Sequence, residues 1–97
     1  MGLFKSLFGP KVDKHQLIKE GALLIDVRSK NEFKAGHPEK AINMPLPNLS
    51  SQIEKIKKEN KKVVTVCQSG MRSAQAKRLL KQSGIEAYNG GSWHNFA

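Results

Sequence analysis

The stretch VVTVCQSGMRSAQAKRLL, residues 63–80, contains a strand pattern, a loop and a helix pattern in direct succession. Residues 63–66 are all β-branched, which is typical of a buried strand. Ala76, Leu79 and Leu80 recur at helical spacing, so we expect a helix over residues 73–82 with these side chains facing inward and Gly84 beyond its end. The residues CQSGMRS would connect the strand to the helix. This order of elements favours an α/β fold.

The same alternation of strands and helices extends along the rest of the chain. The expected elements are a helix from Asp13 to Glu20, a strand over residues 22–27, a helix from Ser29 to Gly36, a strand over residues 41–46, a helix from Ser50 or Ser51 to Asn60, and strands over residues 62–66 and 85–89. Ser29 and Glu32 have the spacing of a capping box. The apolar run ALLIDV, residues 22–27, is typical of a parallel strand that is covered on both faces. We therefore predict an α/β domain in which a parallel β-sheet is flanked by α-helices on both faces.

The length of the chain leaves room for one domain. Single cores commonly serve chains of about 100 to 200 residues, and this chain has 97. We assign residues 12–97 to the domain. Residues 1–11, MGLFKSLFGPK, are assigned to an N-terminal extension with apolar and basic side chains.

Cys67 is the only cysteine in the chain. One cysteine excludes an internal disulfide, a two-cysteine redox motif and a cysteine-rich zinc site. A reducing compartment is the simpler interpretation, and we expect a cytoplasmic protein. His15 and His94 have no companions at metal-ligand spacing, so no metal site is expected.

The net charge of +9 arises from 17 basic and 8 acidic residues and should attract anions to the surface. The densest basic stretch, EKIKKENKKV at residues 54–63, is typical of the solvated face of an amphipathic helix. The sequence has no recognisable nucleic-acid-binding motif and no apolar run long enough to span a bilayer. We therefore expect neither a nucleic acid nor a membrane as partner, and we expect a monomer.

The loop after residue 66 has the composition of an anion-binding turn. Ligands of parallel sheets bind at the carboxyl ends of the strands, where Cys67 is predicted to lie. Gly70 supplies the conformational freedom of a tight turn, and successive backbone amides with the start of the next helix form a cup for an anion. A thiolate there would be stabilised by the amides and Arg72, which favours a nucleophile. The alternative is a buried thiol that ends a core strand.

Three motifs in the expected order resemble the rhodanese-like domain family of sulfurtransferases. They are LLIDVRSKNEFKAGH followed by AINMPL, then CQSGMRSAQAKRLLKQSG, and finally YNGGSW. The resemblance runs from about residue 12 to residue 93. It implies a parallel sheet flanked by helices and a reaction without metal or organic cofactor. It also implies a small anionic sulfur donor such as thiosulfate, with cyanide, a thiol or a partner protein as acceptor.

The resemblance also implies a role for each residue of the loop. Cys67 would be the nucleophile that attacks the outer sulfur of the donor and carries it as a persulfide. The residues expected to bind substrate are Gln68, Ser69, Gly70, Met71, Arg72 and Ser73. The Arg72 side chain would either attract the donor or brace the loop. Ser73 is interpreted as the cap of the next helix rather than as a catalytic hydroxyl.

Residues outside the loop are expected to be structural. Asp26, Arg28 and Glu32 have a spacing that favours an ion pair at the end of the first long strand. Trp93, after a glycine pair, is expected to pack near the rim of the site.

Two other functions share parts of this pattern. A cysteine-dependent phosphatase or arsenate reductase uses a similar loop, but such phosphatases place five residues between cysteine and arginine, whereas only four separate Cys67 from Arg72. A sulfur-carrier or partner-docking module with little turnover on small molecules is the second alternative. Retention of the cysteine with the full loop favours the sulfurtransferase.

Overall fold

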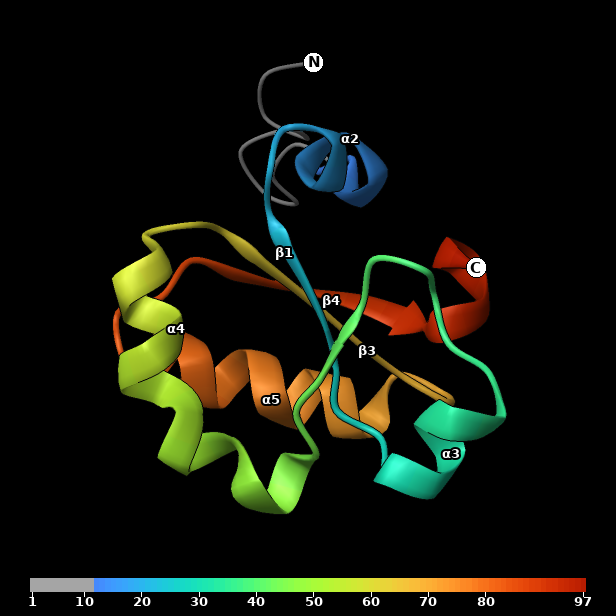
Figure 1. Cartoon of the computed structure of the whole chain (residues 1–97). Coiled ribbons are helices and arrows are strands. Elements are labelled where there is room, and N and C mark those ends of the chain that lie inside the picture. Colours follow the sequence, from blue (N-terminus) through green and yellow to red (C-terminus); the bar gives the residue numbers. More distant parts are fainter. Residues whose placement is uncertain (1–11) are drawn as a thin grey trace, which may run out of the picture.

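The computed structural model describes residues 12–97, and the predicted N-terminal extension lies outside the described residues. Figure 1 shows the arrangement of the elements. The helices are α2 (Lys14–Lys19), α3 (Lys30–Ala35), α4 (Ile53–Glu59) and α5 (Met71–Gln82), with 3-10 helices η1 (Leu46–Gln52) and η2 (Trp93–Phe96). The strands are β1 (Leu23–Asp26), β2 (Ile42–Asn43), β3 (Val63–Cys67) and β4 (Ala87–Ser92).

The four strands form one sheet in the order β2-β1-β3-β4, and every neighbouring pair is parallel. β3 occupies a central position, and all five of its residues are buried. Its register places Thr65 opposite Ile25 of β1 and Asn89 of β4. The predicted fold class, a parallel sheet in an α/β domain, is confirmed.

Helices cover both faces of the sheet. One face packs against α4, η1 and α5, and its buried core includes Ile25, Leu49, Ile56, Val63, Cys67, Ala76 and Leu80. The other face carries a smaller cluster of Leu17, Leu24, Val64 and Val66, against which Trp93 and Phe96 also pack. Side chains alternate along a strand, so Val64 and Val66 face α2 and η2, whereas Cys67 faces the start of α5.

Three of the predicted helix boundaries are confirmed. The Asp13 side chain accepts a hydrogen bond from the backbone of Gln16 at the start of α2. Ser29 and Glu32 form a complete capping box on α3. Asn60 ends α4 in the left-handed conformation. The positions of these three helices could be predicted from local sequence, because capping residues bond to backbone groups that have no partner inside the helix.

Three predicted boundaries are wrong. The second strand, expected over residues 41–46, consists only of the two residues of β2. The helix expected to start at Ser50 or Ser51 is preceded by η1, which already begins at Leu46. Pro45 and Pro47 lack the N–H that a strand needs, and proline suits the first turn of a helix. The last strand starts later than expected because the Ile85 amide still donates to Leu80 at the end of α5.

β4 also ends later than expected and contains a bulge. The pairing with β3 shifts between Thr65 and Val66, so that Gly90 is the extra residue in β4. A side chain at Gly90 would lie 2.9 Å from both Phe96 and Val64. The glycine pair is therefore part of the sheet rather than of a tail.

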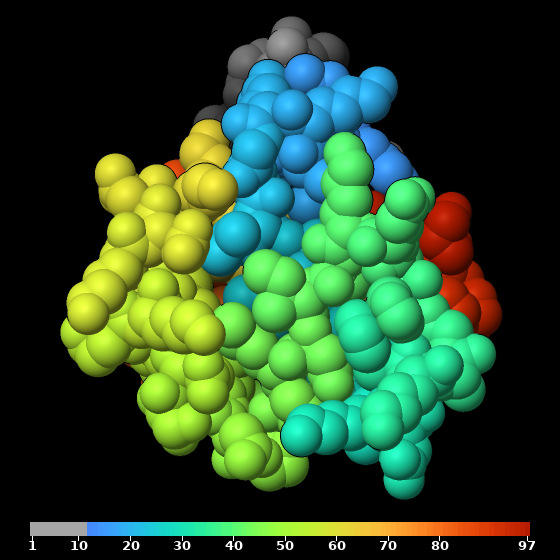
Figure 2. Space-filling view, viewed as in Figure 1, coloured from blue at the N-terminus to red at the C-terminus, as the bar shows by residue number. Residues whose placement is uncertain are grey.

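The edge of the sheet at β2 is at the surface. Figure 2 shows this segment between α4 and α3, and Ile42 is 42% exposed. Within residues 12–97, no helix has the length and apolar character needed to cross a membrane.

Candidate active site

Cys67 is the last residue of β3 and is only 1% exposed. It lies at the carboxyl end of the sheet, where β3 ends near α3 and α5 begins (Figure 1). The backbone N–H of Gly70 donates to its sulfur at 3.0 Å, and that of Ser73 donates at 3.4 Å. The two interpretations left open by the sequence are therefore compatible, because the thiol closes a core strand and also faces the amides of the loop.

The environment of Cys67 favours the thiolate. Burial by itself raises the pKa of the thiol. The Ser73 hydroxyl, at 3.4 Å from the sulfur, lowers the pKa, as do the amides of Ser73, Gly70 and Ser69. The net result is a Cys67 pKa below its ordinary value of 9.0. Hydrogen bonds to the charged form thus outweigh desolvation.

Ser73 is not the helix cap that the sequence predicted. The N-cap of α5 is Gly70, which makes no side-chain capping bond, and Ser73 is the third residue of the helix. The Ser73 amide is one of the first helix amides, which have no acceptor inside a helix. The Cys67 sulfur accepts from it instead, so the sulfur takes the place of a capping side chain. Gly70 has a φ of +102°, as expected for a tight turn.

Asn89 of β4 is a site residue that the sequence analysis missed. Its side-chain amide donates to the Gly70 carbonyl at 3.0 Å, and its oxygen accepts from the Ser73 hydroxyl at 2.6 Å. The same oxygen accepts from the Gly91 amide at 2.9 Å. Asn89 therefore joins both ends of the loop to the strand beside it. The only signal in the sequence was its place before the glycine pair of the closing motif.

Arg72 braces the loop against α3. Its guanidinium makes two hydrogen bonds to the Glu32 carboxylate, at 2.7 and 3.0 Å. Hydrogen bonds from Arg72 and from the Ser29 amide hold the pKa of Glu32 at about 2. Of the two roles predicted for Arg72, this geometry favours bracing.

The predicted ion pair at the end of β1 forms between Asp26 and Arg28, at 2.7 Å, and both side chains are buried. The Glu32 carboxylate does not join it but pairs with Arg72. Arg28 also donates to the Gly36 carbonyl at 2.7 Å. The pair therefore ties β1 to the end of α3, next to the Cys67 loop.

Trp93 lies at the rim of the site, as expected. The Arg28 guanidinium stacks on its ring, 4.5 Å from the centroid. Its indole N–H donates to the Gln68 side chain at 3.2 Å. Gln68 and Ser69 are exposed, and Met71 is 76% exposed. The exposed side chains of the loop above the buried thiol are therefore mostly uncharged.

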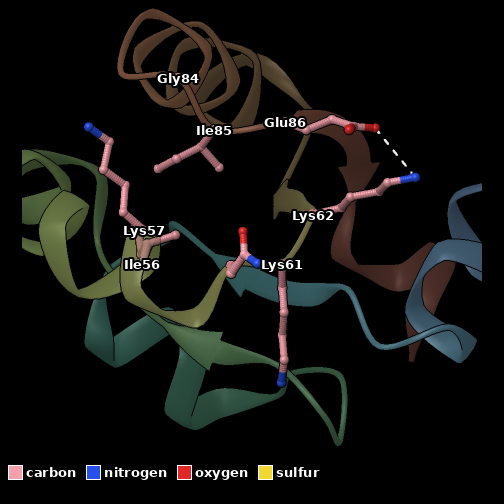
Figure 3. Close-up of a pocket in the computed structure, with 8 residues that line it drawn as sticks. Ile56, Lys57, Lys61, Lys62, Gly84, Ile85 and Glu86 are labelled. Carbon is pink, nitrogen blue, oxygen red and sulfur yellow. Dashed lines mark ion pairs between the residues drawn. The ribbon is translucent and has the colours of Figure 1, made fainter.

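A separate hollow of about 330 Å³ lies at the other end of the sheet. We call it the lysine-lined hollow; its lining residues are Ile56, Lys57, Asn60, Lys61, Lys62, Gly84, Ile85 and Glu86. Figure 3 shows Ile56 and Ile85 on its inner wall and an ion pair between Lys62 and Glu86. That pair is 3.6 Å long. The hollow lies beside the amino end of β3, whereas Cys67 is at the carboxyl end.

The sequence matches the rhodanese-like domain family over residues 11–96, and the chain belongs to this family. It is similar to YqhL of Bacillus subtilis, an uncharacterized protein, with 42% identity over 69 residues that cover 70% of this chain and 54% of YqhL. The chain spans about a fifth of the length of a tRNA uridine(34) hydroxylase from Escherichia fergusonii, to which it is 32% identical over 78 residues.

Two solved structures have the same fold. A rhodanese with anions from E. coli is 30% identical, with a TM-score of 0.71 over 79% of this chain and 93% of that one. The human single-domain sulfurtransferase TSTD1 is 29% identical, with a TM-score of 0.70 over 82% of this chain and 85% of that one. Sulfurtransferases are therefore among the proteins that this chain resembles in fold.

Proposed function

We propose that this protein is a sulfurtransferase that carries sulfane sulfur as a persulfide on Cys67. The donor is thiosulfate or a persulfide, and the acceptor is cyanide, a thiol or a protein. The observation that carries this proposal is the position of the Cys67 sulfur, which accepts backbone hydrogen bonds from Gly70 and Ser73. These bonds favour the thiolate, which is the nucleophilic form of cysteine.

With thiosulfate, the Cys67 thiolate attacks the outer sulfur, the S–S bond of the donor breaks, and sulfite leaves with the bonding electron pair. The product is a persulfide anion on Cys67. Cyanide then attacks the outer sulfur of this persulfide, thiocyanate leaves, and the thiolate returns. The cycle transfers sulfur without net oxidation and uses no metal or organic cofactor. The loop amides are placed to stabilise negative charge on sulfur at each stage.

The phosphatase alternative has less support. Such an enzyme needs its loop arginine to hold the phosphate, and arginine binds an oxyanion best through two parallel hydrogen bonds. Arg72 directs two hydrogen bonds to Glu32. Only four residues separate it from Cys67. Both observations favour sulfur chemistry over phosphate-ester hydrolysis.

Intact-mass measurement tests the proposal directly. After incubation with thiosulfate or cysteine persulfide, the wild type should gain one sulfur atom, and cyanide should remove it. Cys67→Ser should keep its fold, as judged by circular dichroism, and should neither gain sulfur nor produce thiocyanate. The proposal is wrong if neither donor modifies the wild type. Cleavage of an aryl phosphate that depends on Cys67 would then assign the phosphatase function.

A further inference from the structure

A groove follows the edge strand β2 on the face of the molecule that Figure 2 shows, between β2 and α4. It consists of two hollows, of about 540 and about 170 Å³, which share Ile42, Met44 and Lys55 as lining residues. We call these two hollows together the β2 groove. It lies outside the Cys67 loop and is separate from the lysine-lined hollow, with which it shares only Ile56.

The floor of the β2 groove is apolar. Leu23 and Ile56 line the smaller hollow together with Ile42 and Met44. Ile42 is 42% exposed, although it belongs to a strand. Met44 is half-buried, and a methionine side chain adapts its shape to what it contacts. These side chains are suited to bury apolar side chains of a partner.

The backbone of β2 is open on the side that faces away from β1. β2 is the edge strand of the described sheet, and the Met44 amide donates to the Asp26 carbonyl of β1 at 2.9 Å. Consecutive residues of a strand direct their backbone groups to opposite sides, so the Asn43 backbone is directed away from β1. An extended polypeptide can add to such an edge. Because β2 has only two residues, apolar contacts must supply most of the affinity.

The charged side chains of the groove are mainly basic. Lys55 lines both hollows and Lys30 lines the larger one, and both side chains are exposed. Among the ion pairs of residues 12–97, none includes either of these lysines. Glu59, in the smaller hollow, has the Lys61 amine at 3.9 Å. The groove therefore presents two unpaired positive charges, which favours an acidic partner.

Other occupants fit these features less well. A symmetric dimer through the groove would bring the same lysines of two copies together, and each copy has a net charge of +9. A nucleic acid would need aromatic rings for its bases, and the lining residues of both hollows include none. We propose that the β2 groove docks an extended segment of a partner protein in which acidic side chains alternate with apolar ones. This docking does not depend on the sulfur chemistry proposed above.

The groove is close to the candidate active site across the sheet. Asn43 pairs with Asp26 of β1, which pairs with Val66 of β3, the residue before Cys67. Neighbouring strands are about 4.8 Å apart, so the Asn43 backbone is roughly 10 Å from that of Val66. A partner docked in the β2 groove would therefore be near the thiol without occupying its loop.

Fluorescence anisotropy with the full chain tests the docking. The probe is a labelled eight-residue peptide that alternates aspartate with valine, because alternate side chains of an extended segment face the same side. One control peptide replaces aspartate with lysine, and the other replaces valine with serine. We expect the aspartate–valine peptide to bind at least about tenfold more tightly than either control, because each control loses one of the two kinds of contact.

Two variants and their matched controls locate the binding. Lys55→Glu should weaken binding of the aspartate–valine peptide about fivefold or more, whereas Lys57→Glu, on the same helix but in the lysine-lined hollow, should change it by less than about twofold. Ile42→Ser should weaken binding about tenfold. Val12→Ser is its control, because Val12 is 39% exposed and does not line the groove.

Amide chemical shifts of the ¹⁵N-labelled wild type give a readout that does not depend on the folding of a variant. On addition of the peptide, the largest changes should lie in residues 42–44 and 52–56. The proposal is wrong if the largest changes surround the lysine-lined hollow, or if the anisotropy stays unchanged up to about 1 mM protein. Equal weakening by Lys55→Glu and Lys57→Glu would also overturn it, since the attraction would then follow net charge alone.

Two further results would assign the groove to another occupant and overturn the proposal. Dimerisation of the wild type in sedimentation, abolished by Ile42→Ser, would assign it to a second copy of this chain. Peptide binding that appears only after Phe4→Ser and Phe8→Ser would assign it to residues 1–11. The binding is measured without a sulfur donor, so its failure would leave the sulfurtransferase proposal standing.

Discussion

The two ends of the sheet hold their charged groups in different ways. At the carboxyl end, Arg28 and Asp26 form a buried pair at 2.7 Å, and Arg72 binds Glu32 through two short hydrogen bonds. At the amino end, the lysine-lined hollow has only the Lys62–Glu86 pair at 3.6 Å and pairs at 3.9 and 4.0 Å from its other two lysines to nearby glutamates. These lysine side chains are roughly half exposed.

This difference shows that the high net charge does not mark the candidate site. Exposed ion pairs contribute about 0–1 kcal/mol each and are weakened by salt, so the lysine-lined hollow is not a fixed array of charge. The Cys67 loop has almost no free charge, but its amides, hydroxyl and side-chain amide are held in position by hydrogen bonds. Preorganised polar groups of this kind provide the larger effect in catalysis.

The sharpest test of the comparison replaces one glycine at each end of the sheet. Gly70 and Gly84 have φ of +102° and +86°, so alanine costs about 1–2 kcal/mol of stability at either position. At Gly70 the new Cβ would also lie 3.3 Å from the Cα of Gly91 and displace the loop. A displacement of about 1 Å can cost on the order of a hundredfold in rate. We expect Gly70→Ala to slow sulfur gain by about that factor.

Gly84→Ala is the matched control, because nothing lies within 4 Å of its new Cβ. It should lower the free energy of unfolding by a similar amount but leave the rate of sulfur gain within about twofold. Urea unfolding and intact-mass kinetics on both variants check this. Equal losses of activity would mean that the rate follows global stability and not the geometry of the loop.

The sequence predicted those parts of the site that depend on local signals. Cys67 follows a β-branched run, and a left-handed turn favours glycine at position 70, so both could be placed without knowledge of the fold. Asn89 could not, because it reaches the loop only through the parallel pairing of β3 with β4 and the bulge at Gly90. Register and bulges depend on contacts between distant segments, which local periodicity does not contain.

Two errors have a similar cause. Ser73 has a side chain that often caps helices, but here its backbone amide donates to the Cys67 sulfur. This contact joins β3 to α5. Glu32 is four residues from Arg28, which favours a pair within the segment, yet its carboxylate binds Arg72, 40 residues away. Both assignments used residue spacing where the tertiary fold decided between two partners.

The second prediction concerns the brace between the loop and α3. Arg72→Ala removes two charge-assisted hydrogen bonds, each worth about 1.5–3 kcal/mol when buried and less at this exposure, so sulfur gain should fall roughly ten- to fiftyfold. The loss should be similar for thiosulfate and for persulfides, because the charge of Arg72 is already offset. Arg72→Lys should restore only part of the rate, because lysine lacks the planar fork. Arg78→Ala, at an exposed position on the same helix, is the control.

A loss confined to thiosulfate would contradict the bracing role. It would indicate that Arg72 binds the donor directly.

The third prediction is a change in the pH profile of Cys67. Ser73→Ala removes the hydroxyl whose hydrogen bond to the sulfur lowers the pKa of Cys67, so the pKa of the thiol should rise toward 9.0. Alkylation by iodoacetamide at neutral pH should slow about three- to tenfold, because a smaller fraction of the thiol is then ionised. At pH values above 9 the rates of variant and wild type should converge.

The same shift gives a stability readout. Because the pKa of Cys67 is lowered on folding, thiolate formation stabilises the wild type fully above the unfolded pKa of 9.0, and this contribution is lost as pH falls through the folded pKa. Ser73→Ala should flatten this part of the stability curve, whereas Asn95→Ala, in the exposed end of η2, should not. An unchanged alkylation profile in Ser73→Ala would show that the Ser73 hydroxyl donates only to Asn89 and not to the sulfur.

The smallest effect is expected at the lysine-lined hollow. Lys57→Ser combined with Lys61→Ser lowers the net charge from +9 to +7. The amino end of β3 is roughly 13 Å from Cys67 at about 3.3 Å per residue, and interactions between exposed charges are screened over about 8 Å at physiological salt. The rate of sulfur gain should therefore stay within about twofold of the wild type for thiosulfate and for persulfides alike.

If the double variant is much slower with thiosulfate, and added salt removes the difference, the surface field does bring anions to Cys67. The contrast between a fixed, neutral site and a distant charged surface would then be wrong, because the two ends of the sheet would act together in capturing the donor.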